Sequence, residues 1–453
     1  MNSHQSSVIG PHTPVASPQS PIVVIGGGIA GLTAAAHLGQ AGVPAVLLEK
    51  TPAVGGRAAS RNRNGFLFNL GPHALYRAGL LKQTLTSLGI VVHGGIPTGN
   101  GGYALFGGRR HTLPAGLTSL LTTGLLRLSA KFELARFQAR LAGIETAAIR
   151  HEPLGSWLAS HVQDPILSQL LQMLVRVTTF TNDPEHQSAG AALEQMQLGV
   201  RAGVLYLDGG WQTIVDGLRQ AAVARGVRIV AGAHATGLEC ARTGTVDAVR
   251  LHDGSVVRGS AVVIAAPPAE VDALAGTSFA AQLPPPVRVA TLDVALRSLP
   301  KPSATVAFGV DTPLYFSVHS AIAKLAPDGG ALIHASKYLR PGEQAGHAAE
   351  EELQSLIELM QPGWRAHVEH AQYLPSLTVT HAELTAARGG TAGRPTSRLQ
   401  EFDNVFIAGD WVGPRGQLSD AAAASAADAV AAIMAANVAN SPLKACAMST
   451  GAA

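Results

Sequence analysis

Residues 22–49 read IVVIGGGIAGLTAAAHLGQAGVPAVLLE, and this stretch decides the fold. Its first four residues, 22–25, are all apolar, which predicts a strand buried on both faces of a parallel sheet. Residues 32–41 predict a helix, and residues 45–49 predict a second strand that ends in Glu49. A strand, G-x-G-x-x-G, a helix, a strand and an acid within about 30 residues are typical of a dinucleotide-binding α/β unit.

The three glycines of this motif have separate physical tasks. Gly26 permits the tight turn after the strand, Gly28 lets the backbone approach a pyrophosphate, and Gly31 lets the helix pack closely on the strand. The helix N-terminus offers free N–H groups and a partial positive charge to phosphates. The Glu49 carboxylate can accept hydrogen bonds from ribose hydroxyls, which favours NAD or FAD over NADP. The predicted contacts of this segment are Gly26, Gly28, Ile29, Ala30, Gly31, Glu49 and Lys50.

A second motif follows the acid and points to one dinucleotide. Residues 52–58 read PAVGGRA, in which two glycines permit close backbone approach and Arg57 can neutralise phosphate charge. This run resembles the second motif of a flavoprotein superfamily that includes the amine oxidases, protoporphyrinogen oxidases and phytoene desaturases. In that superfamily a GG-R loop runs past the cofactor pyrophosphate. The resemblance therefore implies FAD as the cofactor, with Gly56 and Arg57 as contacts.

The segment 71–76, GPHALY, carries the same resemblance. It is similar to the strand and turn that reach the isoalloxazine ring, and its form looks most like the phytoene-dehydrogenase-related branch. The resemblance implies that Gly71, Pro72 and His73 lie beside the flavin.

The C-terminal part of the chain holds a matching piece. Residues 404–408 predict a strand that ends in Gly409-Asp410-Trp411, and a helix is predicted from about Gln417 to Ala436. In the superfamily such an Asp bonds the ribityl or pyrophosphate part of FAD, and the helix N-terminus stabilises negative charge on the reduced flavin. The contacts that the resemblance implies here are Gly409, Asp410, Gly416, Gln417 and Leu418.

A third segment lies between these two. Residues 227–230 and 235–239 predict a pair of strands, and Ala235 resembles the position whose backbone holds adenine. A hairpin is predicted at Asp253-Gly254, and residues 261–268 resemble the strand that returns to the FAD-binding sheet.

The predicted fold class is α/β: a Rossmann-like FAD-binding domain, of the glutathione-reductase-like type, with a discontinuous α+β substrate domain. The predicted FAD-binding domain comprises 21–95, 201–280 and 396–437, and the substrate domain comprises 96–200 and 281–395. Residues 1–20 are predicted to be a disordered leader and residues 438–453 a flexible tail.

The first insert contains a leucine-rich stretch, Leu113 to Leu141, which predicts a long helix. One interpretation is a helix buried in the substrate domain. The other is the wall of a tunnel, or a peripheral membrane contact, that serves an apolar substrate.

The chemistry favoured by these motifs is dehydrogenation, in which a substrate C–H passes a hydride to flavin N5. Candidate catalytic residues are His73, Tyr76 and Lys337, the last by a local resemblance to the flavin-facing lysine of amine oxidases. No cysteine falls in the flavin-facing segments, so FAD is expected to bind non-covalently. Only one dinucleotide fingerprint is found, so electrons are expected to leave to oxygen or a quinone rather than to a docked nicotinamide.

Several substrates and one other class of protein stay open. The favoured substrate is a small hydrophobic molecule, because no aromatic cage for an amine is evident before the last helix. An amine, amino-acid or porphyrinogen oxidase is an alternative, as is a redox-neutral isomerase that uses reduced FAD. Rab escort and GDP-dissociation inhibitor proteins resemble this fold without a flavin, and Glu49, Arg57 and Asp410 argue against them.

Composition narrows the remaining possibilities. Charged residues make up 14% of the chain, well below the usual ~25%, and the formal net charge is +3. The basic residues are scattered and lack interleaved aromatics, so no nucleic-acid partner is expected. The two cysteines give no disulfide framework or metal-binding spacing, which favours a reducing, cytoplasmic compartment and no metal. Membrane association and an oligomeric state stay open.

Overall fold

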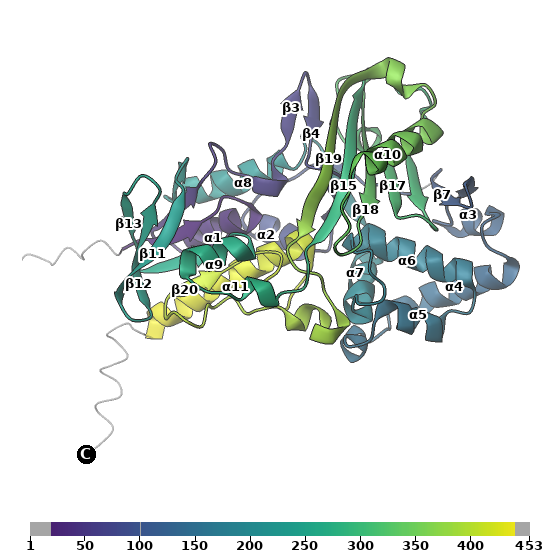
Figure 1. Ribbon diagram of the computed structural model, residues 1–453. Helices are drawn as coiled ribbons and strands as arrows, with labels where there is room; N and C mark the ends of the chain where they lie inside the picture. The colour runs from purple at the N-terminus through teal and green to yellow at the C-terminus, as the bar shows by residue number, and fades with distance from the viewer. Residues whose placement is uncertain (1–19, 100, 440–453) are drawn as a thin grey trace, which may run out of the picture.

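The computed structural model describes residues 20–99 and 101–439. A parallel five-stranded sheet, in the order β10-β2-β1-β14-β20, forms one end of the molecule (Figure 1). Its strands are β1 (Ile22–Ile25), β2 (Ala45–Glu49), β10 (Arg228–Ala231), β14 (Ala261–Ile264) and β20 (Val405–Ile407). The sheet assembles strands from both ends and the middle of the chain, so the N-terminal and C-terminal motifs become neighbours.

Both faces of this sheet are covered. On one face, Val24 and Leu47 pack in a core formed with the helices α1 (Ile29–Gln40), α2 (Leu80–Ser87), α8 (Gln212–Val223) and α11 (Leu418–Ala439). On the other face, Val23 and Val46 pack against the antiparallel sheet β11 (Ala235–Arg242), β12 (Thr245–Leu251) and β13 (Val256–Arg258) and against α9 (Pro268–Ala275). Alternate side chains of a strand point to opposite faces, which explains why these strands are apolar throughout.

A seven-stranded sheet forms the second large unit, in the order β19-β15-β18-β17-β16-β7-β8. Its strands are β7 (Tyr103–Phe106), β8 (Arg109–Thr112), β15 (Val287–Leu296), β16 (Val306–Gly309), β17 (Leu314–Val318), β18 (Ala331–Tyr338) and β19 (Val368–Thr380). The pairs are antiparallel except β16 with β7. Helix α10 (His347–Met360) packs on this sheet through Leu353 and Ile357.

A helical group lies below the seven-stranded sheet in Figure 1. It comprises α3 (Leu117–Thr122), α4 (Leu128–Leu141), α5 (Leu154–His161), α6 (Pro165–Thr179) and α7 (Ala189–Ala202), which share one core. Two small sheets complete the fold: the hairpin of β3 (Arg61–Arg63) and β4 (Phe66–Phe68), and the three-stranded sheet of β5 (Leu75–Tyr76), β9 (Val204–Leu207) and β6 (Gly94–Gly95).

Two predictions about elements were wrong. The long helix predicted over 113–141 is two helices, because Thr123 ends α3 with an extended backbone and its hydroxyl donates to the Thr112 carbonyl at 2.7 Å. The predicted strand pair of 227–230 with 235–239 does not form. The first segment, β10, joins the parallel sheet beside β2, and the second, β11, pairs with β12.

The C-terminal helix α11 is long and apolar enough to cross a membrane by length and composition alone. More than half of that stretch, 56%, is buried inside the protein, where Ala423, Ala426 and Ala429 pack against the parallel sheet's helices. The sequence predicted a helix here, from about Gln417 to Ala436. The predicted leader and tail lie outside the described residues, apart from the few positions at 20, 438 and 439.

Candidate functional site

A cavity of about 770 Å³ opens at the carboxyl ends of the five parallel strands. The loops that follow β1, β2, β10, β14 and β20 all line it, and its other walls come from the seven-stranded sheet and the start of α11. Ligands of open α/β sheets bind at this edge, because the strand ends and the helix N-termini converge there. The cavity is therefore where the predicted cofactor contacts should meet.

The glycine loop between β1 and α1 forms one wall. Gly26 has φ +102°, and a Cβ there would lie 2.4 Å from the Ala265 carbonyl oxygen, so only glycine fits. A Cβ on Gly31 would lie 1.8 Å from the Gly26 oxygen, so Gly31 serves helix packing and does not line the cavity. A Cβ on Gly28 would meet nothing within 4 Å. Gly28, Ile29 and Ala30 therefore present the N-terminus of α1 to open space in the cavity.

Glu49 ends β2 with its carboxylate at the cavity wall. Its Oε2 accepts a hydrogen bond from the Gly27 N–H at 2.7 Å, and its Oε1 accepts from the N–H and hydroxyl of Thr51 at 2.8 and 2.7 Å. A carboxylate has about four acceptor sites, so Glu49 keeps capacity for hydroxyl donors from a ligand. Beside it, Lys50 forms an ion pair with Glu270, and both residues line the cavity.

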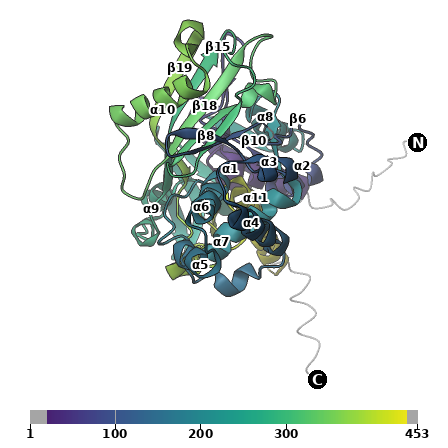
Figure 2. The ribbon, with the colours of Figure 1, turned by 90° about the vertical axis from the view of Figure 1, so that its right-hand side faces the viewer.

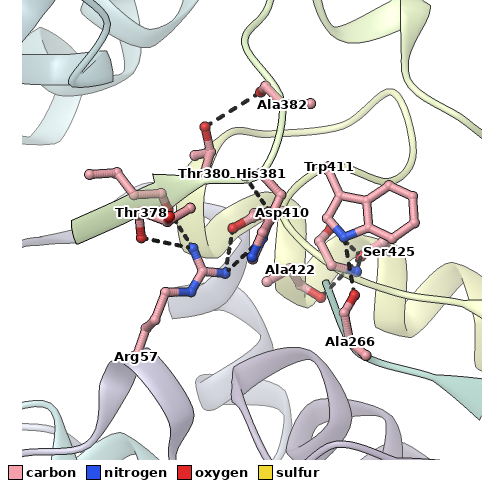
Figure 3. Close-up of polar contacts among 12 residues, drawn as sticks. Arg57, Ala266, Thr378, Thr380, His381, Ala382, Asp410, Trp411, Ala422 and Ser425 are labelled. Atoms are coloured by element: carbon pink, nitrogen blue, oxygen red, sulfur yellow. Dashed lines mark hydrogen bonds and ion pairs between the residues drawn. The ribbon is translucent and has the colours of Figure 1, made fainter. Parts of the chain in front are cut away.

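An ion-paired group, shown in Figure 3, forms part of the cavity wall. Arg57 donates to Asp410 Oδ2 at 2.6 Å and to the Val379 carbonyl at 2.6 Å, and His381 Nδ1 lies 3.0 Å from Asp410 Oδ1. Burial alone would raise the pKa of Asp410, but the Arg57 guanidinium and His381 outweigh burial and lower that pKa well below its usual range. Asp410 is therefore an anion near pH 7. The sequence analysis missed His381, which has no local motif.

The start of α11, the helix that packs beside α1, forms a further part of the wall. Leu418 lines the cavity, whereas Gly416 and Gln417 do not. The Gly416 carbonyl accepts from Arg394, and the Gln417 side chain donates to the Ala191 carbonyl at 2.6 Å. Gly416 and Gln417 therefore anchor the helix start rather than contact the cavity. Arg394 is a second residue that the sequence analysis missed, and burial lowers its pKa to about 10.

The GPHALY turn supplies the next wall. Pro72 and His73 line the cavity, while Gly71 stands behind them and its N–H donates to Asp293 Oδ2 at 3.2 Å. The His73 Nδ1 lies 3.0 Å from the Gly71 carbonyl, and its ring centroid lies 4.9 Å from that of Trp211. Burial lowers the pKa of His73 to about 4, so this imidazole is neutral at pH 7.

A buried polar cluster lies behind this turn, between β15 and β18. His334 Nδ1 lies 2.6 Å from Asp293 Oδ1, and neither side chain is exposed. Thr291 donates to the same carboxylate oxygen at 3.1 Å, and the His319 ring meets the His334 ring edge-on, with centroids 4.5 Å apart. The sequence analysis missed this cluster. The sequence feature that could have revealed the cluster is a polar residue at alternate positions of two largely apolar strands, β15 and β18.

Two of the three predicted catalytic side chains do not reach the cavity. The Tyr76 hydroxyl donates to the Thr178 carbonyl at 2.9 Å, and Tyr76 does not line the cavity. Lys337 forms ion pairs with Glu352 at 2.8 Å and Glu343 at 3.6 Å, outside the cavity. Alternation along β18 turns Lys337 away from the face of His334 and toward α10, which carries Glu352. The catalytic prediction for Lys337 is therefore corrected to a surface ion pair.

The remaining predicted contacts meet at the cavity. Gly56, Arg57, Ala235, Gly409 and Asp410 all line it, together with Gly26 and Glu49. Gly56 begins a short 3₁₀ turn, Gly56–Ala58, at φ +53°, which directs Arg57 toward Asp410. The structure thus brings together residues from about 25 to 422 of the sequence around one volume.

Comparisons with known proteins agree with this arrangement. The family model described as "Flavin containing amine oxidoreductase" matches residues 29–315, more than half of the chain. Human protoporphyrinogen oxidase is 39% identical over 132 residues, which cover 26% of this chain and 27% of that protein. The carotenoid 3,4-desaturase of Haloarcula japonica is 49% identical over 51 residues, which cover 11% of this chain and 10% of that protein. The chain thus matches about a quarter or less of the length of these curated relatives.

A solved structure extends the likeness to the whole fold. An oxidoreductase from Methanosarcina mazei superposes with a TM-score of 0.70 at 19% identity, over 91% of this chain and 99% of that chain. The family match establishes a flavin-dependent oxidoreductase whose cofactor is FAD. On this evidence the chain belongs to the flavin-containing amine oxidoreductase family.

Proposed function

We propose that the parallel sheet and its helices form a Rossmann-like, glutathione-reductase-like FAD-binding domain, built from residues 21–95, 201–280 and 396–437. We assign residues 96–200 and 281–395 to the substrate domain. The cavity supports this division, because its strand-end loops come from the first set of residues. Phe180, Val289 and Leu377, from the second set, form its apolar wall.

The cavity fits FAD at each end. Gly28 leaves open space at the N-terminus of α1, where N–H groups and Arg57 can hold the pyrophosphate. Glu49 can accept the ribose hydroxyls, and Ala235 lies at the adenine end of the same wall. His73, Trp211 and the start of α11 would enclose the flavin ring. Cys240 lies exposed on β11 and does not line the cavity, which supports non-covalent binding.

We propose further that the substrate is a small hydrophobic molecule that loses a hydride from a C–H bond. When bound, FAD supplies a hydride acceptor at flavin N5. The observation that carries this proposal is that each carboxylate in the cavity wall already has a hydrogen-bond or ion-pair partner. Glu49 is bonded by Gly27 and Thr51, Glu270 by Lys50, and Asp410 by Arg57 and His381. Among the described residues, every carboxylate of this wall already has a partner, and the remaining acceptor capacity of Glu49 is assigned to the ribose hydroxyls of FAD. None is then left to hold a substrate ammonium group.

The chain's own residues would position the substrate and exclude water. Phe180, Leu70, Ala74 and Leu377 provide apolar surface beside the flavin end. His73 is neutral at pH 7, and its Nε2 can accept a proton that the substrate releases, since its Nδ1 is engaged with the Gly71 carbonyl. Electrons would then leave to oxygen or a quinone.

Porphyrinogen oxidation is the second candidate, and a specific observation favours it. Protoporphyrinogen oxidases are among the curated relatives with the longer high-identity matches. A porphyrinogen carries carboxylates at its rim, so this candidate requires a cation near the flavin end. Arg57 is the nearest cation of the cavity wall, and Asp410 already pairs with it.

A reduction assay separates these candidates. The purified yellow protein is made anaerobic and mixed in turn with a carotenoid precursor, protoporphyrinogen and a diamine, and loss of the flavin absorbance is followed. Bleaching by the apolar polyene alone supports the proposal, and bleaching by the diamine or the porphyrinogen overturns it. Peroxide release after air is readmitted distinguishes oxygen as the acceptor from a quinone.

A further inference from the structure

Helices α3 and α4 expose large apolar side chains at the end of the molecule opposite the β11–β13 sheet (Figure 1). Both helices lie toward the viewer when the molecule is turned by 90° (Figure 2). Leu117 and Leu121 on α3 are 76% and 64% exposed, and Leu128 and Phe132 on α4 are 67% and 70% exposed. Each pair is spaced four residues apart, so each lies on one face of its helix. These four residues form the α3–α4 apolar patch.

The two halves of the patch adjoin each other. Lys131, next to Phe132, donates from Nζ to the Leu121 carbonyl at 2.7 Å, which brings α4 against the end of α3. The inward faces of the same helices already supply the core through Leu120 and Leu134, which are 8% and 2% exposed. The patch is therefore additional to the apolar surface that folding needs. Contiguous exposed apolar side chains of this kind mark an interaction surface.

The segment of sequence that carries the patch is strongly basic, and the acids that the structure brings against it from elsewhere include Asp164, beside Arg127, and Asp311, at the β7–β8 turn. Residues 103–144 contain six basic residues and one acidic residue, a formal charge of +5, whereas the whole chain carries +3. The basic residues are Arg109, Arg110, Arg127, Lys131, Arg136 and Arg140. The single acid, Glu133, is half-buried and accepts from the Gln163 N–H at 2.6 Å. Of the six bases, Arg127 alone forms an ion pair with another described residue, Asp164.

We propose that the α3–α4 apolar patch docks on the surface of a lipid bilayer that contains anionic lipids. In this arrangement the four apolar side chains enter the boundary between headgroups and acyl chains, and the surrounding bases face lipid phosphates. A second copy of this chain is a poorer occupant, because it would bring two basic α4 helices together, each with Lys131, Arg136 and Arg140. The inference stands on α3 and α4 alone and does not depend on the identity of the substrate.

Vesicle sedimentation tests the inference with the full flavin-loaded protein. The probes are vesicles of phosphatidylcholine alone and of phosphatidylcholine with phosphatidylglycerol. We expect binding to the anionic vesicles, weakened by salt because surface charge is screened. The variant L117S/L121S/L128S/F132S should lose at least about tenfold in partitioning, because the buried apolar area drives insertion. The matched control is V91S/V223S/V256S, which removes exposed apolar side chains elsewhere and should bind like the wild type.

Each alternative outcome overturns the inference. Equal binding by the wild type and the four-serine variant would show that the patch is not the contact with the vesicle. Equal binding to both vesicle types would show that anionic lipid is not required. If light scattering shows a dimer that the four-serine variant splits, and neither form binds vesicles, the patch is a self-association surface instead. Retention of the flavin absorbance and of the thermal midpoint in the four-serine variant confirms that it is folded.

Discussion

Gly28 and Gly31 belong to one loop, but the structure predicts opposite consequences when each is changed to alanine. At Gly28 the backbone is extended, with φ −78°, and an added Cβ meets nothing within 4 Å. The apoprotein should therefore lose little stability, since replacing an N-cap glycine by alanine costs ~0.5–1 kcal/mol and the stiffer unfolded chain offsets it by ~0.4–1 kcal/mol. The new methyl group would occupy the space where the pyrophosphate approaches the helix.

The expected loss in cofactor affinity follows from the hydrogen bonds at that helix end. Displacing the pyrophosphate removes at least one hydrogen bond to a charged group, which contributes ~1.5–3 kcal/mol. G28A should thus bind FAD roughly 10–150-fold more weakly than the wild type. At Gly31 the Cβ would lie 1.8 Å from a backbone oxygen, so G31A should unfold more easily by ~3 kcal/mol. With an unfolding entropy of about 2.1 cal/mol/K per residue, that is a midpoint lower by ~3 °C.

Two measurements on apoprotein check this pair: the thermal midpoint by circular dichroism, and FAD affinity by quenching of flavin fluorescence. Gly116 provides the matched control, because it is also an extended N-cap glycine with open space around it but lies outside the cavity. G116A should keep both values. If G28A bound FAD within twofold of the wild type, Gly28 would not be the point of close approach and the site assignment would fail.

Three further changes test separate features. Burial, with repulsion from Asp183, raises the pKa of Glu383 to about 8. The native state therefore loses stability as the pH rises from about 4.5 to 8. In thermal melts, E383Q should be more stable than the wild type by ~2 kcal/mol at pH 8 and equally stable near pH 4.5. D293N should lose ~1.5–3 kcal/mol in urea unfolding, because His334, Thr291 and the Gly71 N–H lose the buried carboxylate to which they are hydrogen-bonded. K337M should leave the rate of anaerobic flavin reduction within twofold of the wild type, and a tenfold loss would restore a catalytic role for Lys337.

Local patterns predicted the elements that depend on neighbouring residues. The observed bounds lie close to the predicted ones for the strand Ile22–Ile25, for the helix after it and for the strand Ala45–Glu49. The agreement is good because apolar periodicity and glycine chemistry act over short distances. The contact of Arg57 with Asp410 joins residues 353 positions apart. The sequence indicated both residues through the superfamily resemblance, not through any rule of spacing.

The parts that the sequence did not reveal depend on tertiary pairing. Asp293 and His334 meet only because β15 and β18 pair in a register that sets them directly opposite each other. Lys337 lies on the other face of β18. A shift of one position moves a strand residue to the opposite face, and the residue types of the strand do not reveal which face each residue occupies. Similarly, the segment 228–231 can pair with any apolar strand, and burial beside β2 selects the parallel sheet over its neighbour in sequence.

The position of β20 and α11 has a consequence for how the protein matures in the cell. During translation the glycine loop leaves the ribosome hundreds of residues before Asp410 and the start of α11. A nascent chain therefore lacks part of the binding surface until Asp410 has been synthesised. Capture of the cofactor should follow the synthesis of α11 and should then hold the segment around Gly28 to the segment around Asp410.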